Sequence, residues 1–271
     1  MKPKVYIKIC DSGWIIEKMA KTLADQIPHV LYGLEEEENA DLVYHIPYLT
    51  YQGNSNVRRI GYFTHMEQDE VRRSYFLRAA AAFEHRVCQS KKTADILISN
   101  GFDKISIISP GVDLQAFTPE LRIGVVGRTY DSGRKGEELV RSVISLPGIT
   151  WKFTGKGWPG EPKLLADSEM PDFYRSVDYI LVPSLNEGGP MCVLEALACG
   201  RPVIAPDVGW VSEFPHIPYE TGDPESLRHV LLKIQDDQMQ LRASVLSRTW
   251  QNWAAQHVVL FQSLLANPRN S

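Results

Sequence analysis

The sequence has few features of a secreted, metal-binding or membrane-spanning protein. It has no CxxC pair and no histidines at metal-ligand spacing, and its four cysteines are scattered: Cys10, Cys88, Cys192 and Cys199. Scattered thiols are typical of a reducing compartment and not of a disulfide framework. No apolar run is long enough to cross a bilayer, and the start, MKPKVYIKIC, alternates like a strand without the apolar stretch of a signal peptide. We therefore expect a cytoplasmic protein without a metal site.

A strongly basic composition, a Walker loop and a GxGxxG fingerprint are also missing. The formal net charge is -4, so no global charge attracts the chain to nucleic acid. With 44% hydrophobic and 23% charged residues, the 271-residue chain is globular and long enough for one large domain or two smaller ones. Any nucleotide site must come from a combination of loops.

Short β-branched runs alternate with helical patterns along the whole chain. Such alternation with nearly all-apolar strands is typical of parallel sheets covered on both faces. The runs fall into two sets, separated by the turn-rich residues 110–120, so we predict an α/β protein with two Rossmann-like, doubly wound domains at 1–116 and 117–246. The expected strands are 5–9, 41–46, 58–64 and 105–109 in the first set, and 122–127, 150–155, 178–184 and 202–206 in the second.

The last segment, 247–271, has tryptophans and other apolar residues at helical spacing. It predicts a long terminal helix that packs on a domain. Two placements are open at this point: the helix covers its own domain, or it crosses back to the first one.

The segment PSLNEGGPMCVLEALACGRPVIAP, at 183–206, predicts a short helix with an unusual entrance. Pro190 suits a first helical turn and Gly200 is a good helix stop, so the helix should run from about Pro190 to Cys199. Gly188 and Gly189 form the loop that enters it. Free amides at such an entrance, together with the helix dipole, make a site for an anion.

Two glutamates flank this predicted anion site. Glu187 precedes the glycines, and Glu195 lies inside the helix, roughly 7 Å along its axis. Two carboxylates around a pyrophosphate match a nucleoside-diphosphate sugar, with one holding sugar hydroxyls and the other the ribose diol. The alternative is structural: a glutamate near a helix start complements the dipole, and a glutamate within a helix is usually solvated.

Cations for the same anion are available in GRTYDSGRKG, at 127–136. Arg128 directly leaves a predicted strand, and Arg134 and Lys135 follow in a glycine-bearing loop. Ligands of parallel sheets bind beyond the carboxyl ends of the strands, which is where these charges should lie. A solvated surface loop explains Arg134 more readily than Arg128.

These segments resemble the retaining GT-B glycosyltransferases of the sucrose-synthase and glycogen-synthase-like group (glycosyl transferases group 1, family 4-like). Residues 173–214 look like the family's signature block, in which seven residues separate the two glutamates. Residues 105–119 resemble the interdomain element, residues 127–136 the donor-diphosphate loop, and the final helix the family's crossing helix. The resemblance covers most of residues 105–265. It implies two domains facing across a cleft, with a shortened N-terminal domain and a terminal helix that crosses back to it.

The resemblance also implies an activity: metal-independent transfer of a sugar from a UDP- or GDP-type donor to an acceptor hydroxyl, with retention of configuration. The mechanism usual for the group is a front-face displacement assisted by the leaving diphosphate, with no cofactor. The implied catalytic residues are Glu187, Arg128, Lys135 and His65. The implied donor-binding residues are Gly13, Gly127, Arg128, Lys135, Gly155, Lys156, Glu187, Gly188, Gly189, Pro190, Met191, Cys192 and Glu195.

The first half of the chain resembles the family less closely. Gly13 stands at the close-approach position of the first glycine loop, His65 follows a strand that would face the donor sugar, and Ser90 begins a helix as a structural or cleft residue. Trp210 replaces a glycine of the family block and would narrow the cleft or pack. A different GT-B enzyme, such as an epimerase, lacks this glutamate block. A non-catalytic sugar-nucleotide-binding or scaffold subunit is the main alternative.

The acceptor is open between a glycan, a lipid-linked sugar, a protein, a metabolite and modified DNA. The segment 71–86 predicts a helix with Arg72, Arg73, Arg78 and Arg86. Such a helix either has a solvated basic face or makes a peripheral contact with an anionic membrane or a nucleic-acid backbone.

Overall fold

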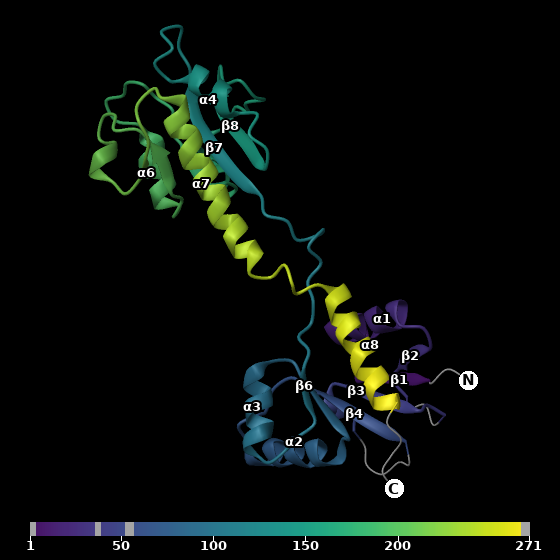
Figure 1. Ribbon diagram of the computed structural model, residues 1–271. Coiled ribbons are helices and arrows are strands. Elements are labelled where there is room, and N and C mark those ends of the chain that lie inside the picture. The colour runs from purple at the N-terminus through teal and green to yellow at the C-terminus, as the bar shows by residue number, and fades with distance from the viewer. Residues whose placement is uncertain (1–3, 36–38, 52–56, 267–271) are drawn as a thin grey trace. The chain divides into compact units, whose positions relative to one another are not determined.

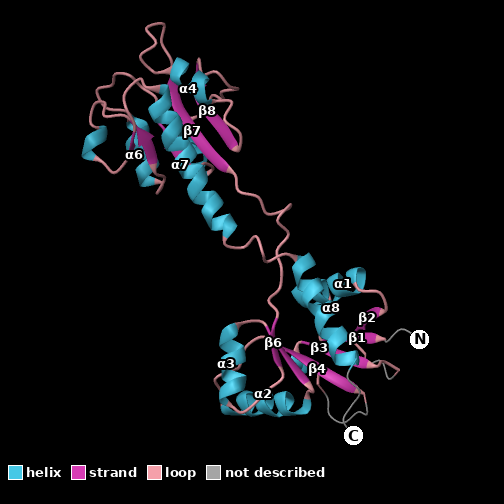
Figure 2. Ribbon diagram, viewed as in Figure 1, coloured by secondary structure: helices cyan, strands magenta, loops and turns pink. Residues whose placement is uncertain are grey.

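A computed structural model describes residues 4–35, 39–51 and 57–266 (Figure 1). The chain forms two compact units: unit 1 comprises Met1–Phe117 with Val245–Ser271, and unit 2 comprises Thr118–Ser244. Each unit has a parallel sheet with helices on both faces (Figure 2). The predicted α/β class with two Rossmann-like sheets is confirmed. The cleft between two facing domains stays a prediction.

The sheet of unit 1 has the strand order β2-β1-β3-β4-β5-β6. Because all its pairs are parallel, the loops that follow β1, β3 and β4 leave the sheet at the same edge. The strands are β1 (Val5–Ile9), β2 (Val30–Gly33), β3 (Leu42–Ile46), β4 (Arg58–Phe63), β5 (His85–Cys88) and β6 (Ile105–Ile107).

Two pairs of helices cover the two faces of this sheet. The apolar faces of α1 (Ile15–Gln26) and α8 (Trp250–Ala266) pack on alternate buried residues of β1, β3 and β4. On the other face, α2 (Glu70–Ala82) and α3 (Lys91–Ser99) pack on Phe63 and Cys88. None of the helices that the structure describes is both long and apolar enough to cross a membrane.

The helix predicted at 71–86 is wrong in its last residues, because α2 ends at Ala82 and His85–Cys88 form β5. Burial between β4 and β6 overrides the helical pattern there. Arg86 is 7% exposed, and its guanidinium donates to the backbone oxygens of Ala80 at 2.8 Å and Asp103 at 3.2 Å. It therefore has no place in a solvated basic face.

Unit 1 contains three histidines that burial keeps neutral. His257 on α8 is fully buried, with Nδ1 2.8 Å from the Trp253 carbonyl and Nε2 3.0 Å from the Tyr44 hydroxyl. Desolvation lowers the pKa of His257 to about 4 and that of His85 to about 4. Burial, followed by the charges of Arg59 and Lys8, lowers the pKa of His45 to about 3.

Unit 1 should therefore lose stability on acidification before unit 2 does. An unfolded imidazole takes up a proton near pH 6.5, whereas these folded ones resist protonation until pH 4 or below. Between these pH values each histidine therefore lowers the free energy of unfolding by about 1.4 kcal/mol for every pH unit of acidification. In unit 2 the pKa values of the Asp178 and Glu187 carboxyls are lowered. These two groups therefore predict a loss of stability only below the ordinary pKa range of carboxyl groups. Hydrogen exchange by mass spectrometry at pH 7, 5.5 and 4.5 should show protection lost first in unit 1. Equal or reversed loss would contradict this.

The sheet of unit 2 has the order β11-β10-β9-β7-β8. Helices α4 (Glu137–Val143) and α7 (Pro224–Ala243) cover one face, while α5 (Met170–Arg175) and α6 (Met191–Ala198) cover the other. The strands are β7 (Leu121–Arg128), β8 (Ile149–Lys156), β9 (Tyr179–Leu181), β10 (Val203–Ala205) and β11 (Ile217–Pro218).

Candidate functional site

The loops that leave β7, β8 and β9 bring most of the predicted donor residues to one edge of unit 2. Gly127 pairs with Gly155, and Arg128 pairs with Lys156, at the carboxyl ends of β7 and β8. Gly155 has a φ of 106°, and a Cβ there would collide with the Gly127 carbonyl. Glycine is thus required for the close approach of the two strand ends.

Glu187 lies in the loop after β9 and is the most strongly held of these residues. Its side chain is 9% exposed. The carboxylate accepts a short hydrogen bond and ion pair from Lys135, a bond of 2.8 Å from the Ser184 hydroxyl and one of 3.3 Å from Arg134. Leu185 N also donates to the Arg134 carbonyl at 2.8 Å, so the 134–136 and 183–187 loops form one structure.

The surroundings of Glu187 keep it ionised at neutral pH. Burial by itself raises the pKa of this carboxyl, but the hydrogen bonds from Lys135 and Ser184, with the charges of Lys135 and Arg134, lower it below its ordinary value. Glu187 is thus a nearly buried carboxylate in contact with two cations. A solvated glutamate would not need these partners.

The structure reverses the expectation from the sequence that Arg134, more than Arg128, is a solvated loop residue. Arg134 contacts Glu187 and the Asn186 carbonyl at 3.3 Å, and so is no solvated loop residue. Arg128 is exposed, and its guanidinium carbon lies 5.5 Å from the Tyr130 ring centroid, with that of Arg134 at 4.5 Å from the same ring. Within the described residues Arg128 has no carboxylate partner, so it is available to an anionic ligand.

The α6 entrance has the predicted form. Met191 begins the helix, Pro190 caps it without a side-chain hydrogen bond, and Cys199 closes it. The first amides of a helix have no intrahelical acceptor, and a Cβ on Gly188 would meet nothing within 4 Å. The backbone is therefore open to a ligand at Gly188. Burial raises the pKa of the Cys192 thiol to about 12, so this thiol is neutral at physiological pH.

Trp210 closes the other side of this entrance. An ideal Cβ on Gly189 would lie 2.5 Å from the Trp210 ring, and one on Gly209 would lie 2.5 Å from the Gly188 carbonyl. Gly209 has a φ of 58°, which favours glycine. Trp210 thus packs directly against the glycine pair, a role that the sequence left open.

Gly189→Ala should destabilise unit 2 by about 1–3 kcal/mol, because the new methyl meets the indole. Trp210→Ala should relieve that clash, so the double variant should cost less than the sum of the single variants by about 1 kcal/mol or more. Urea unfolding of the four proteins measures this coupling. Strictly additive costs would show that the two residues do not touch.

Glu195 is exposed on α6 and is oriented by one buried partner. The hydroxyl of Tyr174, which is 1% exposed, donates a short hydrogen bond to Glu195 Oε2. Burial, followed by this bond, raises the pKa of Tyr174 far above its ordinary range. The tyrosine is a fixed donor, and the second carboxylate oxygen stays available. The local sequence predicts neither the bond from Tyr174 to Glu195 nor the bond from Arg134 to Glu187, because the partners lie 21 and 53 residues apart.

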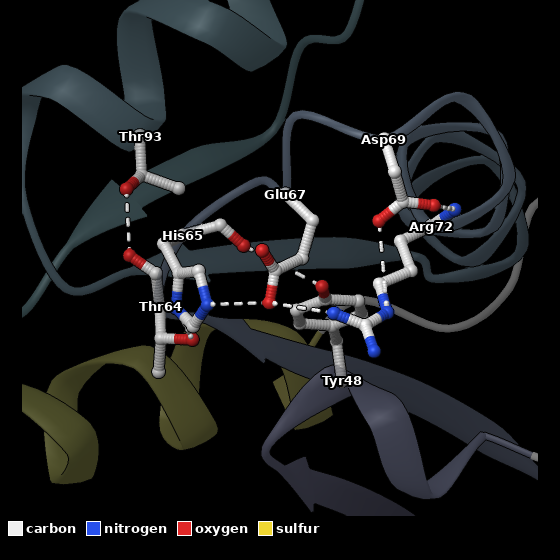
Figure 3. A network of polar contacts seen from close by, with 7 residues as sticks. All are labelled: Tyr48, Thr64, His65, Glu67, Asp69, Arg72 and Thr93. Carbon is white, nitrogen blue, oxygen red and sulfur yellow. Dashed lines mark hydrogen bonds and ion pairs between the residues drawn. The ribbon is translucent and has the colours of Figure 1, made fainter.

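The segment after β4 places His65 in an exposed polar network of unit 1 (Figure 3). His65 Nε2 lies 3.4 Å from Glu67 Oε1, and Arg72 lies 3.6 Å from the same oxygen. Thr93 donates to the Thr64 carbonyl at 2.9 Å and ties α3 to this segment. Its neighbour Ser90 caps α3 by accepting from Thr93 N at 3.2 Å, so Ser90 is a structural residue.

Gly13 lies in the loop between β1 and α1, at the same edge of the sheet of unit 1. Its φ is 83°, and a Cβ there would meet nothing within 4 Å. Its amide donates to Glu17 Oε2 at 2.7 Å. Gly13 and His65 belong to unit 1 and the other predicted donor residues to unit 2.

Comparison with known proteins relates this site to one family. The family model of glycosyl transferases group 1 matches residues 109–237, which include the basic loop and both glutamates. A D-inositol 3-phosphate glycosyltransferase from Pseudarthrobacter chlorophenolicus is 31% identical over 164 residues, covering 45% of this chain and 39% of that protein. A GDP-mannose-dependent alpha-mannosyltransferase from Mycobacterium tuberculosis is 28% identical over 209 residues, covering 62% of this chain and 53% of that protein. The chain thus spans about half or less of these relatives.

Two solved structures align along nearly the whole chain at low similarity. Sucrose-phosphate synthase from Thermosynechococcus elongatus has a TM-score of 0.43 and 15% identity, covering 98% of this chain and 100% of that one. HepE from Anabaena, in complex with UDP, has a TM-score of 0.43 and 14% identity, covering 96% and 100%. The match to the group 1 glycosyltransferase model, at residues 109–237, covers just under half of the chain.

Proposed function

We propose that this protein is a group 1 glycosyltransferase, an enzyme that transfers a sugar from a nucleoside-diphosphate sugar to an acceptor hydroxyl. The observation that carries the proposal is the ionised, nearly buried Glu187, held by Lys135 and Arg134 beside the open amides of the α6 entrance. A pyrophosphate bound at that entrance would meet amides, the helix dipole and cations together.

In this proposal the protein acts mainly by electrostatics. The C1–O bond to the diphosphate breaks with its electron pair on the phosphate oxygen, and the amides of Gly188 to Met191, with Arg128 and Lys135, stabilise that charge. The acceptor oxygen bonds to C1 on the same face, and its proton passes to the departing phosphate. This gives retention without a metal.

The two carboxylates would position the two ends of the donor. Glu187 lies next to the pyrophosphate entrance and would accept hydrogen bonds from sugar hydroxyls, as its fixed geometry allows. Glu195 would accept from the ribose diol, with Tyr174 holding its other oxygen. The strand ends at Gly127 and at Gly155–Lys156 would border the diphosphate and the base. For His65 and Gly13 of unit 1, a role toward the donor sugar or the acceptor stays a prediction from the sequence.

UDP- and GDP-type donors are both compatible with this site. The relatives carry names that specify GDP-mannose in one case and inositol 3-phosphate in the other, so a mannosyl or related hexosyl donor and a small or lipid-linked acceptor are the first choices to assay. A cytoplasmic location accords with the use of nucleotide sugars.

A thermal-shift screen over UDP, GDP, ADP, UDP-glucose and GDP-mannose tests the donor site without knowledge of the acceptor. A ligand at a hundred times its Kd should stabilise the folded protein by about 2.7 kcal/mol. Mass-spectrometric detection of sugar transfer or donor hydrolysis with the best ligand then tests for enzymatic activity. Binding without any turnover would favour the non-catalytic subunit, and no binding would remove the donor site altogether.

A further inference from the structure

Glu195 is an exposed residue of α6 whose side chain is nevertheless held in one orientation. A glutamate within a helix normally keeps its carboxylate in water, where the side-chain torsions stay free. Here Oε2 accepts a short hydrogen bond from the hydroxyl of Tyr174 on α5. Within the part of the chain that the structure describes, this carboxylate has no cation as a partner. Tyr174 is therefore the group that orients it.

The donor of this hydrogen bond is itself immobile. The ring of Tyr174 is buried in the same core cluster as Val193 and Ala196 of α6. The ring of Phe173 packs on it edge to face, with the two centroids 5.9 Å apart. Burial, followed by the bond to Glu195, raises the pKa of the Tyr174 phenol far above its ordinary range. The hydroxyl thus stays protonated and donates from a fixed point.

The two carboxylate oxygens of Glu195 consequently differ. Oε2 is engaged by Tyr174, whereas Oε1 has no hydrogen-bond partner among the described residues. Because one oxygen is anchored, the other is presented in a fixed direction. A fixed acceptor binds a hydroxyl more tightly than a mobile one, since the side chain is ordered before the ligand arrives.

We propose that Tyr174 is a positioning residue, which holds Glu195 so that the donor site distinguishes a ribose from a sugar that lacks the 2′ and 3′ hydroxyls. The inference rests on the proposed function, in which Glu195 accepts from the ribose diol, and it adds the residue on which this selectivity depends. The structural alternative is that Glu195 only provides an acceptor for the buried Tyr174 hydroxyl. In that case loss of the hydroxyl leaves ribose recognition unchanged.

Tyr174→Phe tests the inference, because it removes the hydroxyl and keeps the ring in the core. The matched control is Tyr219→Phe, since Tyr219 is a buried tyrosine of the same unit whose hydroxyl donates to the Val182 carbonyl at 3.0 Å. Calorimetric titration with UDP and GDP, and with their 2′,3′-dideoxy analogues, gives the ratio of the two Kd values for each protein. We expect the wild type and the control to bind the dideoxy form about hundredfold more weakly than the ribose form. In Tyr174→Phe this ratio should fall to about tenfold or less.

A third variant separates positioning from a loss of stability. Glu195→Ala should also lower the ratio, and Tyr174→Phe/Glu195→Ala should lower it no further, because a hydroxyl without the carboxylate has nothing to position. The ratio of Kd values describes folded molecules only, so a less stable variant does not imitate the effect.

Each result decides the inference. A wild-type ratio in Tyr174→Phe, or equal weakening of the ribose and dideoxy forms, overturns it and leaves the proposed function standing, because the nucleotide still binds. A ratio near one in the wild type also overturns it, because Glu195 then makes no contact with the ribose. No binding of either nucleoside diphosphate by the wild type contradicts the proposed function and the inference together.

Discussion

Lys135→Ala should lower kcat/KM for sugar transfer by about 10²–10³-fold, because it removes a preorganised cation from the departing diphosphate. It should also weaken nucleoside diphosphate binding. Lys135 is 17% exposed, and its ion pair with Glu187 holds it beside the α6 entrance. Steady-state transfer assays with donor varied, combined with thermal shifts, measure both effects. Circular dichroism should show unit 2 still folded, because the backbone of the 134–136 loop keeps its bond to Leu185.

Arg141→Ala is the matched control for Lys135. Arg141 is a half-exposed cation on α4 of the same unit and is paired with Glu138 at 3.1 Å. Its removal changes the net charge equally but should leave turnover within about twofold of the wild type, as expected for a surface pair. Wild-type turnover in Lys135→Ala, or an equal loss in Arg141→Ala, would refute the assignment of Lys135.

Glu187→Gln should separate binding from transfer. Loss of the carboxylate frees Lys135 and Arg134 from their partner, so affinity for a nucleoside diphosphate should stay the same or rise. Transfer should nevertheless fall by about 10²-fold, because the group that would position the sugar hydroxyls no longer carries charge. Calorimetric titration with the nucleoside diphosphate and transfer kinetics on the same preparation measure the two effects.

The same variant distinguishes the structural explanation of Glu187. If Glu187 serves only to fix the 134–136 loop, then Glu187→Gln should weaken nucleotide binding and transfer together. Loss of binding with no further loss in kcat would therefore count against a role for Glu187 at the sugar.

The sequence was sufficient to predict those elements whose first and last residues are determined by their immediate neighbours. Pro190 and Gly200 predicted a helix that the structure places at Met191–Ala198, and the apolar run at 5–9 is β1 to the residue. Both rest on backbone preferences or burial that a few neighbouring residues determine.

What the sequence could not reveal depends on partners far along the chain. β5 is hidden at the end of a helical pattern, because only its neighbours β4 and β6 make it a strand. The sequence predicts a solvated Arg134, because its contact with the 183–187 loop is formed only in the fold. The role of Trp210 is likewise clear only once the structure shows Gly189 against its ring. Tyr174 gives no local sign of holding Glu195.

A crystal structure with the nucleoside diphosphate selected by the screen tests the central claim most directly. The account predicts pyrophosphate density at the amides of Gly188 to Met191, with Arg128 and Lys135 in contact and the ribose next to Glu195. A nucleotide bound elsewhere in unit 2, with that helix entrance vacant and Glu187 still closed on Lys135, would contradict it.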